Sequence, residues 1–308
     1  MKFLFLFMDG VGLGVDDPLL NPLVAEEMPN LKALLDGNHL AAGIPPLETR
    51  RASLRALDAV MEVLGLPQSA TGQASLLTGK NVSDLVGKHY GPKPNRAVRD
   101  VLAEGTLFSA LTEAGYRAGL LNAYPDQYFK AISSGRRLYS AIPQAVANAG
   151  ILLNGQVELF AGKALSADFT GEGWRDRLGL ATVPVYSPGE AGAKMVELTN
   201  GLDLAFFEFW PSDYAGHRQN WDDARALLAH FDRMLGGLLS AWEDQSGLVL
   251  ITSDHGNLEA LDTRRHTANL VPALVIGAPE LRQQFVQNLQ TLADVAPAIL
   301  QFYPGARL

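Results

Sequence analysis

Two runs of apolar residues near the carboxyl end of the chain restrict the possible folds most strongly: LVLITS at 248–253 and VPALVIG at 271–277. Unbroken runs of Val, Ile and Leu are typical of strands buried on both faces, whereas half-exposed strands alternate polar and apolar residues. The first run ends at Asp254 and His255, and His266 precedes the second. Since ligands in open α/β sheets bind beyond the carboxyl ends of such strands, this polar segment is a candidate site.

Further strand-like and helix-like segments alternate along the chain. In the segment 221–242 the apolar side chains form one helical stripe, and Asn220 is suited to cap its first turn. Alternation of this kind predicts an α/β fold with a mostly parallel central sheet covered by helices on both faces. The sequence predicts strands over 2–8, 117–123 and 202–210, and helices over 29–36, 52–64, 106–114, 221–242 and 288–301.

We expect a single domain over residues 1–308. A chain of 308 residues with 47% hydrophobic content can form one large core. The regular alternation of elements lies in residues 1–125 and 191–308, which we predict to form this core. Residues 126–190 are less regular and rich in Gly, Ser and Ala, so we predict that they form a small cap or insertion over the carboxyl edge of the sheet.

Charge and composition exclude several classes of function. The formal net charge of −8 argues against a general nucleic-acid surface, because phosphate backbones are bound by clustered Lys and Arg. The absence of cysteine excludes disulfides, thiolate metal sites, iron–sulfur clusters and Cys nucleophiles. No segment approaches the ~20 apolar residues of a membrane helix, and the apolar run at 3–8 is too short for a signal peptide. We therefore expect a cytoplasmic protein without membrane contact; the sequence does not indicate its oligomeric state.

Three aspartates and three histidines stand near predicted strand ends. Taken singly, each could belong to a turn or a surface pair, but together they offer ligands that suit zinc or manganese. Two such ions can clamp the attacking and leaving oxygens of a displacement at phosphorus. Asp213 and His217 are four residues apart, so one helical turn places them on the same side. The sequence thus predicts two divalent metal ions, Zn or Mn, held among Asp9, Asp213, His217, Asp254, His255 and His266.

A candidate nucleophile lies in LPQSATGQASLLTG, residues 66–79. Small hydroxyl residues precede Gly72, and an apolar stretch follows. A Ser at a helix N-terminus is well placed as a nucleophile, since the free N–H groups and the helix dipole favour an oxyanion. The alternative is that Ser69 or Thr71 only caps the helix.

The glycines of DGVGLG, residues 9–14, allow a second interpretation. Their pattern is close to a dinucleotide-binding fingerprint, which would indicate a dehydrogenase. The match is incomplete, because Val15 stands where the third glycine belongs, and Asp9 would repel a pyrophosphate. This interpretation also leaves the other Asp and His residues without a role.

These motifs, in this order, resemble the alkaline phosphatase superfamily and, within it, the branch of cofactor-independent phosphoglycerate mutases and phosphopentomutases. The matching pieces are MDGVG, QSATGQ, DYAGH, TSDHGN and RRHTANLVP. The resemblance implies an alkaline-phosphatase-like three-layer α/β/α fold. It also implies a nucleophile at Ser69, with Thr71 as the fallback. It would assign one metal to Asp213, His217 and His266, and the other to Asp9, Asp254 and His255.

The sequence departs from the mutase pattern at two points. Gln73 stands where the mutases have His, and the interval from Ser69 to Asp213 leaves no room for their large second domain. We therefore expect a two-metal phosphoryl-transfer enzyme that hydrolyses a phosphate mono- or diester and binds a small phosphorylated substrate. The alternatives are a phosphomutase of the phosphoglycerate or phosphopentose type, a nucleotide-binding dehydrogenase, and a non-catalytic metal-binding relative.

Overall fold

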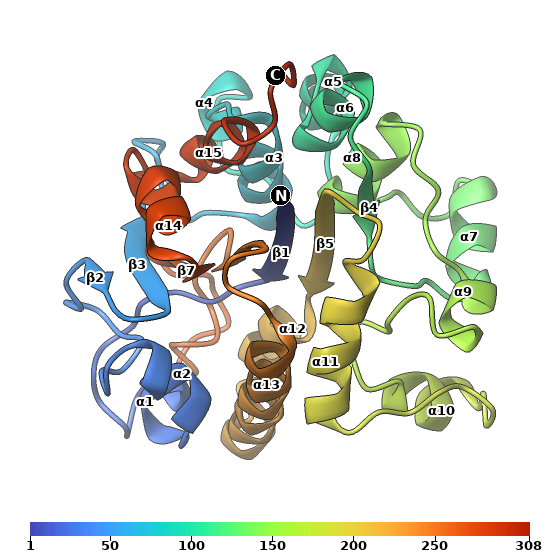
Figure 1. The fold of residues 1–308 in the computed structure, drawn as a ribbon. Helices are drawn as coiled ribbons and strands as arrows, with labels where there is room; N and C mark the ends of the chain where they lie inside the picture. The colour runs from blue at the N-terminus through green and yellow to red at the C-terminus, as the bar shows by residue number, and fades with distance from the viewer.

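The fold, taken from a computed structural model that describes residues 1–308, is built around one seven-stranded sheet (Figure 1). The strand order across the sheet is β2-β3-β7-β6-β1-β5-β4. The strands are β1 (Lys2–Met8), β2 (Leu47–Glu48), β3 (Ala52–Leu57), β4 (Ala118–Leu120), β5 (Leu204–Phe209), β6 (Gly247–Thr252) and β7 (Val271–Gly277).

The sheet is mixed, with its parallel part in the centre and at the β4 edge. The pairs β1–β5, β1–β6 and β4–β5 are parallel. β7 runs antiparallel to both β6 and β3, and β2 is antiparallel to β3. The predicted α/β class is confirmed, with β7 as a reversed strand inside the sheet.

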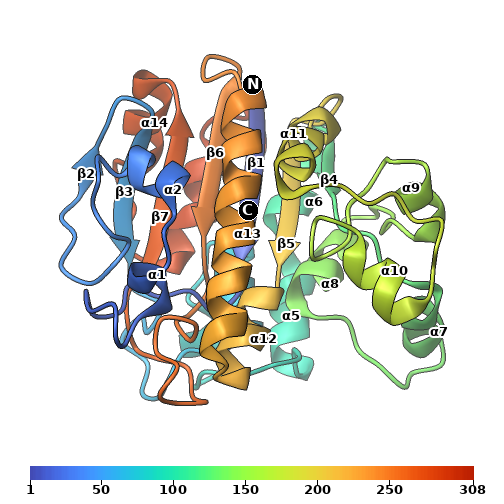
Figure 2. The same cartoon turned by 90° about the horizontal axis from the view of Figure 1, so that it is seen from below.

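Helices cover both faces of the sheet because the side chains of the central strands alternate between two cores. Phe3, Phe5 and Phe7 of β1 point into one core, together with side chains of α3, α5, α6, α8, α14 and α15. Leu4 and Leu6 point into the other core, together with side chains of α1, α2, α11 and α13. These four helices lie on one face of the sheet (Figure 2). Every residue of β5, β6 and β7 is buried, as the apolar runs predicted.

The helix bounds follow the sequence signals closely where a cap residue is present. Asn220 accepts a hydrogen bond from the Asp223 N–H and begins α13, the long predicted helix. None of the helices is long and apolar enough to span a bilayer. The helices are α1 (Pro22–Ala25), α2 (Pro29–Leu34), α3 (Ser69–Thr78), α4 (Val82–Leu85), α5 (Arg96–Glu104), α6 (Leu107–Glu113), α7 (Asp126–Ser133), α8 (Ala141–Asn148), α9 (Gln156–Phe160), α10 (Glu172–Leu178), α11 (Pro188–Leu198), α12 (Pro211–Arg218), α13 (Trp221–Ala241), α14 (Pro279–Val286) and α15 (Val295–Leu300), with a 3₁₀ turn at Leu292–Asp294.

The predicted helix over 52–64 is wrong. Residues Ala52–Leu57 form β3, which pairs with β7 on one side and β2 on the other. Asp58 then accepts hydrogen bonds from the Val60 and Met61 N–H groups, which turns the chain at once. Pairing with a distant strand outweighs the helical spacing of these residues, because propensity is only a weak local preference. The last predicted helix is shorter than expected and is confined to α15.

Residues 126–190 divide into two parts with different packing. α8 packs in the main core beside α3 and α5, with Ile142 and Val146 buried there. α7, α9 and α10 gather beyond β4, at one edge of the sheet (Figure 1). A small separate cluster of apolar side chains, centred on Leu159 and Trp174, supports this outer part. The segment therefore flanks the β4 edge, and its role as a cap stays a prediction.

Candidate metal centre

The three central parallel strands bring the predicted ligands together. Asp9 directly follows β1, and Asp254 and His255 follow β6. α12, which carries Asp213 and His217, follows β5. Since β1 lies between β5 and β6 and all three run in the same direction, their carboxyl ends meet at one edge of the sheet.

His266 reaches the same place from the opposite chain direction. It lies five residues before β7, which is antiparallel to β6. The beginning of β7 is therefore at the edge where β6 ends. An isolated bridge between Gly256 and Thr267 holds the two flanking loops side by side.

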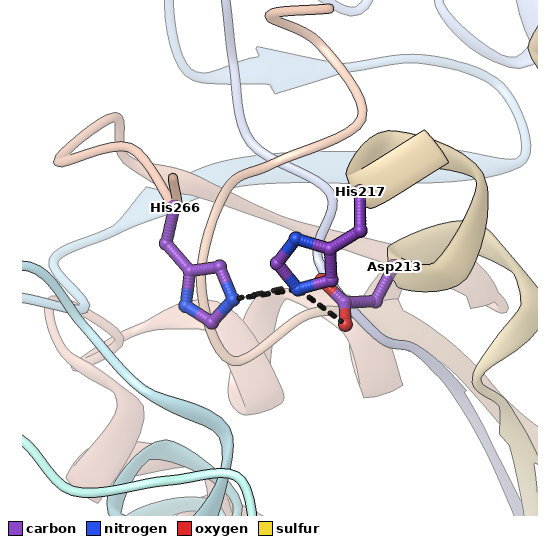
Figure 3. Close-up of side chains that lie close together, drawn as sticks. All are labelled: Asp213, His217 and His266. Carbon is purple, nitrogen blue, oxygen red and sulfur yellow. Dashed lines mark hydrogen bonds and ion pairs between the residues drawn. The ribbon is translucent and has the colours of Figure 1, made fainter. Parts of the chain in front are cut away.

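Asp213, His217 and His266 form a first group of candidate ligands (Figure 3). His217 Nε2 lies 3.3 Å from Asp213 Oδ2 and 3.4 Å from His266 Nε2. His266 Nε2 lies 3.7 Å from Asp213 Oδ1. One carboxylate oxygen and two imidazole nitrogens thus point to a common centre, as a zinc or manganese ion requires.

Asp9, Asp254 and His255 surround a second centre beside the first. His255 Nε2 lies 3.4 Å from Asp9 Oδ1 and 3.6 Å from Asp254 Oδ2. Asp213 also lies within ligand distance of Asp9 and His255, so it stands between the two groups. All six predicted residues lie together, but the second group with converging ligand atoms is Asp9, Asp213 and His255, with Asp254 beside it. The assignment of Asp254 as a ligand, and the ligand role of all six residues, stay predictions.

Each histidine is oriented by its other ring nitrogen. Nδ1 of His217 lies 2.9 Å from the Arg264 carbonyl oxygen, and Nδ1 of His266 lies 2.8 Å from that of Pro67. A backbone carbonyl can only accept, so each Nδ1 carries a proton and Nε2 is free for a ligand. Metal-ligating histidines in proteins are typically oriented by such a second hydrogen bond.

The charge balance of the site also fits a bound cation. Asp9 Oδ1 and Asp254 Oδ2 are buried and have no hydrogen-bond partner. Burial and the neighbouring Asp254 raise the pKa of Asp9 well above its usual value, and burial likewise raises the pKa of Asp254. Buried carboxylates that lack donors are costly unless a positive charge compensates them. The residues therefore fit two divalent ions.

The pKa values of His255 and His266 are shifted in opposite directions, for different reasons. Burial disfavours the charged form of His255, but Asp254 and Asp9 outweigh it and raise the pKa to about 10. Burial, together with the charge of His255, lowers the pKa of His266 to about 4. The two rings stack with centroids 3.7 Å apart. A cation in the site would replace the positive charge that His255 carries.

Ser69 lies beside the second group, whereas Thr71 does not. Ser69 is the first residue of α3, and its Oγ is 3.1 Å from His255 Nε2. The Thr71 hydroxyl is fully buried and accepts a hydrogen bond from the Tyr90 N–H at 3.1 Å. Of the two candidates, only Ser69 presents its oxygen to the predicted metal ligands.

Further residues lie near the site; of these only Gln73 was singled out from the sequence, as a departure from the mutase pattern, and Asn257 and Glu208 were not. Gln73 Nε2 lies 3.4 Å from Asp9 Oδ2, so the residue that departs from the mutase pattern contacts the site. Asn257 Nδ2 donates to Asp213 Oδ1 at 2.6 Å and orients it. Glu208 is the second-to-last residue of β5, and burial and Asp9 raise its pKa to about 7. A lone Glu inside the apolar run AFFEFW was a signal for such a buried charge.

The glycines at 12 and 14 do not form a nucleotide-binding turn. A Cβ at Gly14 would lie 2.6 Å from Cγ of Glu259, and one at Gly12 would overlap Glu259 Oε1. The close approach that these glycines allow is thus made by a side chain of this protein, Glu259. The dehydrogenase interpretation loses its only structural basis.

Comparisons with known proteins agree with this geometry. Residues 184–304 match the family model of the Metalloenzyme superfamily, and this range contains five of the six candidate ligands but not Asp9. The chain is 34% identical over 125 residues to a 2,3-bisphosphoglycerate-independent phosphoglycerate mutase of Ruegeria, covering 38% of this chain and 24% of the mutase. A mutase of the same name from Coxiella burnetii is 31% identical over 183 residues, or 54% of this chain and 32% of the relative.

Solved structures of similar fold extend over the whole chain. The PH0037 protein of Pyrococcus horikoshii has a TM-score of 0.57 at 17% identity, covering 100% of this chain and 98% of its own. Alkaline phosphatase from the Antarctic bacterium TAB5 has a TM-score of 0.53 at 13% identity, with 99% of both chains covered. The mutase matches confirm the resemblance to cofactor-independent phosphoglycerate mutases, and the structures confirm the predicted alkaline-phosphatase-like fold. The chain spans only a quarter to a third of the mutases it matches.

Proposed function

We propose that this protein is a metal-dependent phosphoryl-transfer enzyme in which Ser69 is the nucleophile. The observation that carries the proposal is the position of Ser69 Oγ, 3.1 Å from His255 Nε2 and beside two groups of Asp and His side chains. Such a pair of groups is suited to a phosphate ester, whose oxygens carry charge that two divalent cations can offset.

The residues suited to hold the two ions are those of the two groups, with Asp213 between them. When bound, zinc or manganese would polarise the phosphoryl oxygens and lower the pKa of a nearby hydroxyl. The identity of the metal is part of the proposal; Asp and His ligands suit both.

Ser69 Oγ would attack phosphorus in line with the leaving oxygen. The new Oγ–P bond forms while the ester P–O bond breaks, and the serine proton finally resides on the released alcohol. The N-terminal N–H groups and the dipole of α3 favour negative charge at this position. Water or a second hydroxyl would then take the phosphoryl group from Ser69.

We propose water as the acceptor and a small phosphate mono- or diester as the substrate. Only residues 70–212 separate the nucleophile from Asp213, and α8 within them packs in the main core. Little of this chain is therefore left to enclose an intermediate and return its phosphate. A mutase is the second candidate, supported by the relatives that carry the name phosphoglycerate mutase.

The proposal is tested with metal-stripped protein refilled with Zn²⁺ or Mn²⁺, assayed on p-nitrophenyl phosphate and on its bis-ester. The Ser69→Ala variant should lose about 10³-fold or more of the metal-dependent rate. Thr78→Val is the matched control, because Thr78 is a buried residue at the other end of α3 whose hydroxyl donates only to the Ala74 carbonyl.

The outcomes separate the candidates. Metal-dependent nitrophenol release that Ser69→Ala loses and Thr78→Val keeps supports the nucleophile and the hydrolase. If 3-phosphoglycerate is isomerised instead, with no free phosphate released, the mutase is correct. Full activity in the presence of EDTA would refute the mechanism, and stoichiometric metal binding without turnover of any ester would favour a non-catalytic relative.

A further inference from the structure

A buried carboxylate, Glu259, lies behind the candidate metal centre and belongs to neither group of ligands. It is 1% exposed. Its Oε2 accepts hydrogen bonds from the N–H groups of Gly12 at 2.9 Å and Asn257 at 2.8 Å. Its Oε1 accepts from the Thr267 hydroxyl at 2.5 Å and the Asn269 side-chain amide at 3.0 Å. One side chain thus receives four hydrogen bonds.

The donors come from three segments, one after β1 and two within the connection from β6 to β7. Gly12 follows Asp9 by three residues, Asn257 follows His255 by two, and Thr267 is next to His266. Each segment therefore carries at least one candidate ligand. Glu259 connects all three at a single point.

The backbone is packed too closely around this carboxylate for most side chains. A Cβ at Gly12 or at Gly256 would overlap Glu259 Oε1, and the added Cβ at Gly256 would also overlap Thr267 Oγ1. Gly12 and Gly14 of the loop after β1, and the Gly of SDHGN, are thus explained by close approach to Glu259. Both loops are shaped to fit this one side chain.

We propose that Glu259 is a positioning residue that holds the loop after β1, the loop after β6 and the segment of His266 in the arrangement that binds the metals. The inference rests on the proposed function only in assuming that the centre binds divalent ions. Side chains that orient metal ligands from behind typically change metal affinity or activity 10- to 100-fold when removed.

Two substitutions separate the role of the hydrogen bonds from that of the fold. In Glu259→Ala, the buried N–H groups of Gly12 and Asn257 lose their acceptor and cannot reorient. In Glu259→Gln, the carbonyl oxygen can keep both of them, while the new NH₂ group faces Thr267 and Asn269. The hydroxyl and the amide of those two residues can each turn to accept. Glu259→Gln should therefore keep the metal affinity that Glu259→Ala loses.

Asp232 provides a matched control away from the site. It is 2% exposed and accepts hydrogen bonds from both nitrogens of Asn30 and from the Leu31 N–H, which joins α13 to α2. Asp232→Ala removes a carboxylate of similar burial and similar connectivity. It should lower the melting temperature without altering the metal centre.

The experiment measures Mn²⁺ binding to metal-stripped protein by calorimetry, together with the electron paramagnetic resonance spectrum of the bound Mn²⁺. All measurements are made well below the melting temperature of each variant. For Glu259→Ala we expect about 10- to 100-fold weaker binding and a changed spectrum. For Glu259→Gln we expect affinity within about threefold of the wild type, and for Asp232→Ala no change in affinity or spectrum.

Unchanged Mn²⁺ affinity in Glu259→Ala would overturn the inference, as would an equal loss in Asp232→Ala. Failure of the proposed function is recognised separately. A wild type that binds Mn²⁺ but transfers no phosphoryl group refutes the function, while the loss of affinity in Glu259→Ala would still support the positioning role. A wild type that binds no Mn²⁺ or Zn²⁺ refutes both.

Discussion

Ser69 Oγ lies 3.1 Å from Nε2 of His255, although the two residues are 186 positions apart in the sequence. The contact exists because α3 begins where β6 ends. Gly72 faces the Asp254 backbone so closely that a Cβ there would lie 2.8 Å from the Asp254 carbonyl oxygen. The approach of α3 to the loop after β6 therefore sets the nucleophile against the second group of ligands.

From this contact we expect phosphoserine at position 69 during turnover. Protein that is loaded with metal and quenched in acid while it acts on a phosphate ester should carry the modification, because phosphoserine is stable in acid. Peptide mass spectrometry should locate it on Ser69 and find none in Ser69→Ala. Phosphate on Thr71 would transfer the role of nucleophile to that residue, despite the contact of its hydroxyl with Tyr90.

The first group of ligands should depend on His217. This side chain supplies one of the two imidazoles of the group and is itself oriented by the Arg264 carbonyl. We expect His217→Ala to reduce the bound metal from two ions to one, measured by elemental analysis after dialysis at limiting metal. His230→Ala is the control, since His230 is exposed on α13 and belongs to neither group. Two ions retained in His217→Ala would remove His217 from the ligand set.

Gly10 should tolerate no side chain. Its φ is +68°, and an added Cβ would lie 2.6 Å from Asp213 Oδ1. Gly10→Ala should therefore lower the free energy of unfolding by roughly 2–4 kcal/mol and weaken metal binding. Gly37 is the matched control: its φ is +86°, but nothing lies within 4 Å of an added Cβ. Gly37→Ala should cost about 1–2 kcal/mol in urea unfolding and leave metal binding unchanged. Equal effects in the two variants would show that backbone strain alone is responsible.

The strand ends, and with them the candidate site, could be predicted from the sequence because burial on both faces gives a local signal. β7 has the predicted bounds, and β1 and β6 end at the predicted polar residues. Asp254 and His255 end an apolar run abruptly. A buried strand with no site at its end does not need charged residues at that position. The parallel order of β1, β5 and β6 then brings Asp9, Asp213 and Asp254 to one edge of the sheet.

Contacts between distant segments could not be predicted. Residues Ala52–Leu57 have helical spacing but form a strand, because β7, more than 200 residues later, offers a partner. Glu259 gives no local sign that three loops converge on it, since its donors at Gly12 and Thr267 are placed by the sheet. The reversal of β7 was not predicted either, although only that reversal allows His266 to reach the site.

Glu208 should make the stability of the metal-free protein depend on pH. Burial and the charge of Asp9 raise the pKa of Glu208 to about 7, above its usual value of 4.5. The folded state therefore keeps a proton that the unfolded state releases between about pH 4.5 and 7. The stabilisation that protonated Glu208 contributes is fully present below pH 4.5, and it is lost as the pH rises through this window.

Glu208→Gln removes this titration while it keeps the size of the side chain. The stability of the variant relative to the wild type should rise by about 3 kcal/mol between pH 4.5 and pH 7.5, measured by urea unfolding in EDTA. Tyr124→Phe is a useful control, because the Tyr124 hydroxyl donates to Glu208 Oε2 at 3.1 Å and stabilises its charged form. Its loss should raise the pKa of Glu208 further and extend the pH window upward. A difference between Glu208→Gln and wild type that is constant across this range would mean that Glu208 is ionised throughout in the folded protein.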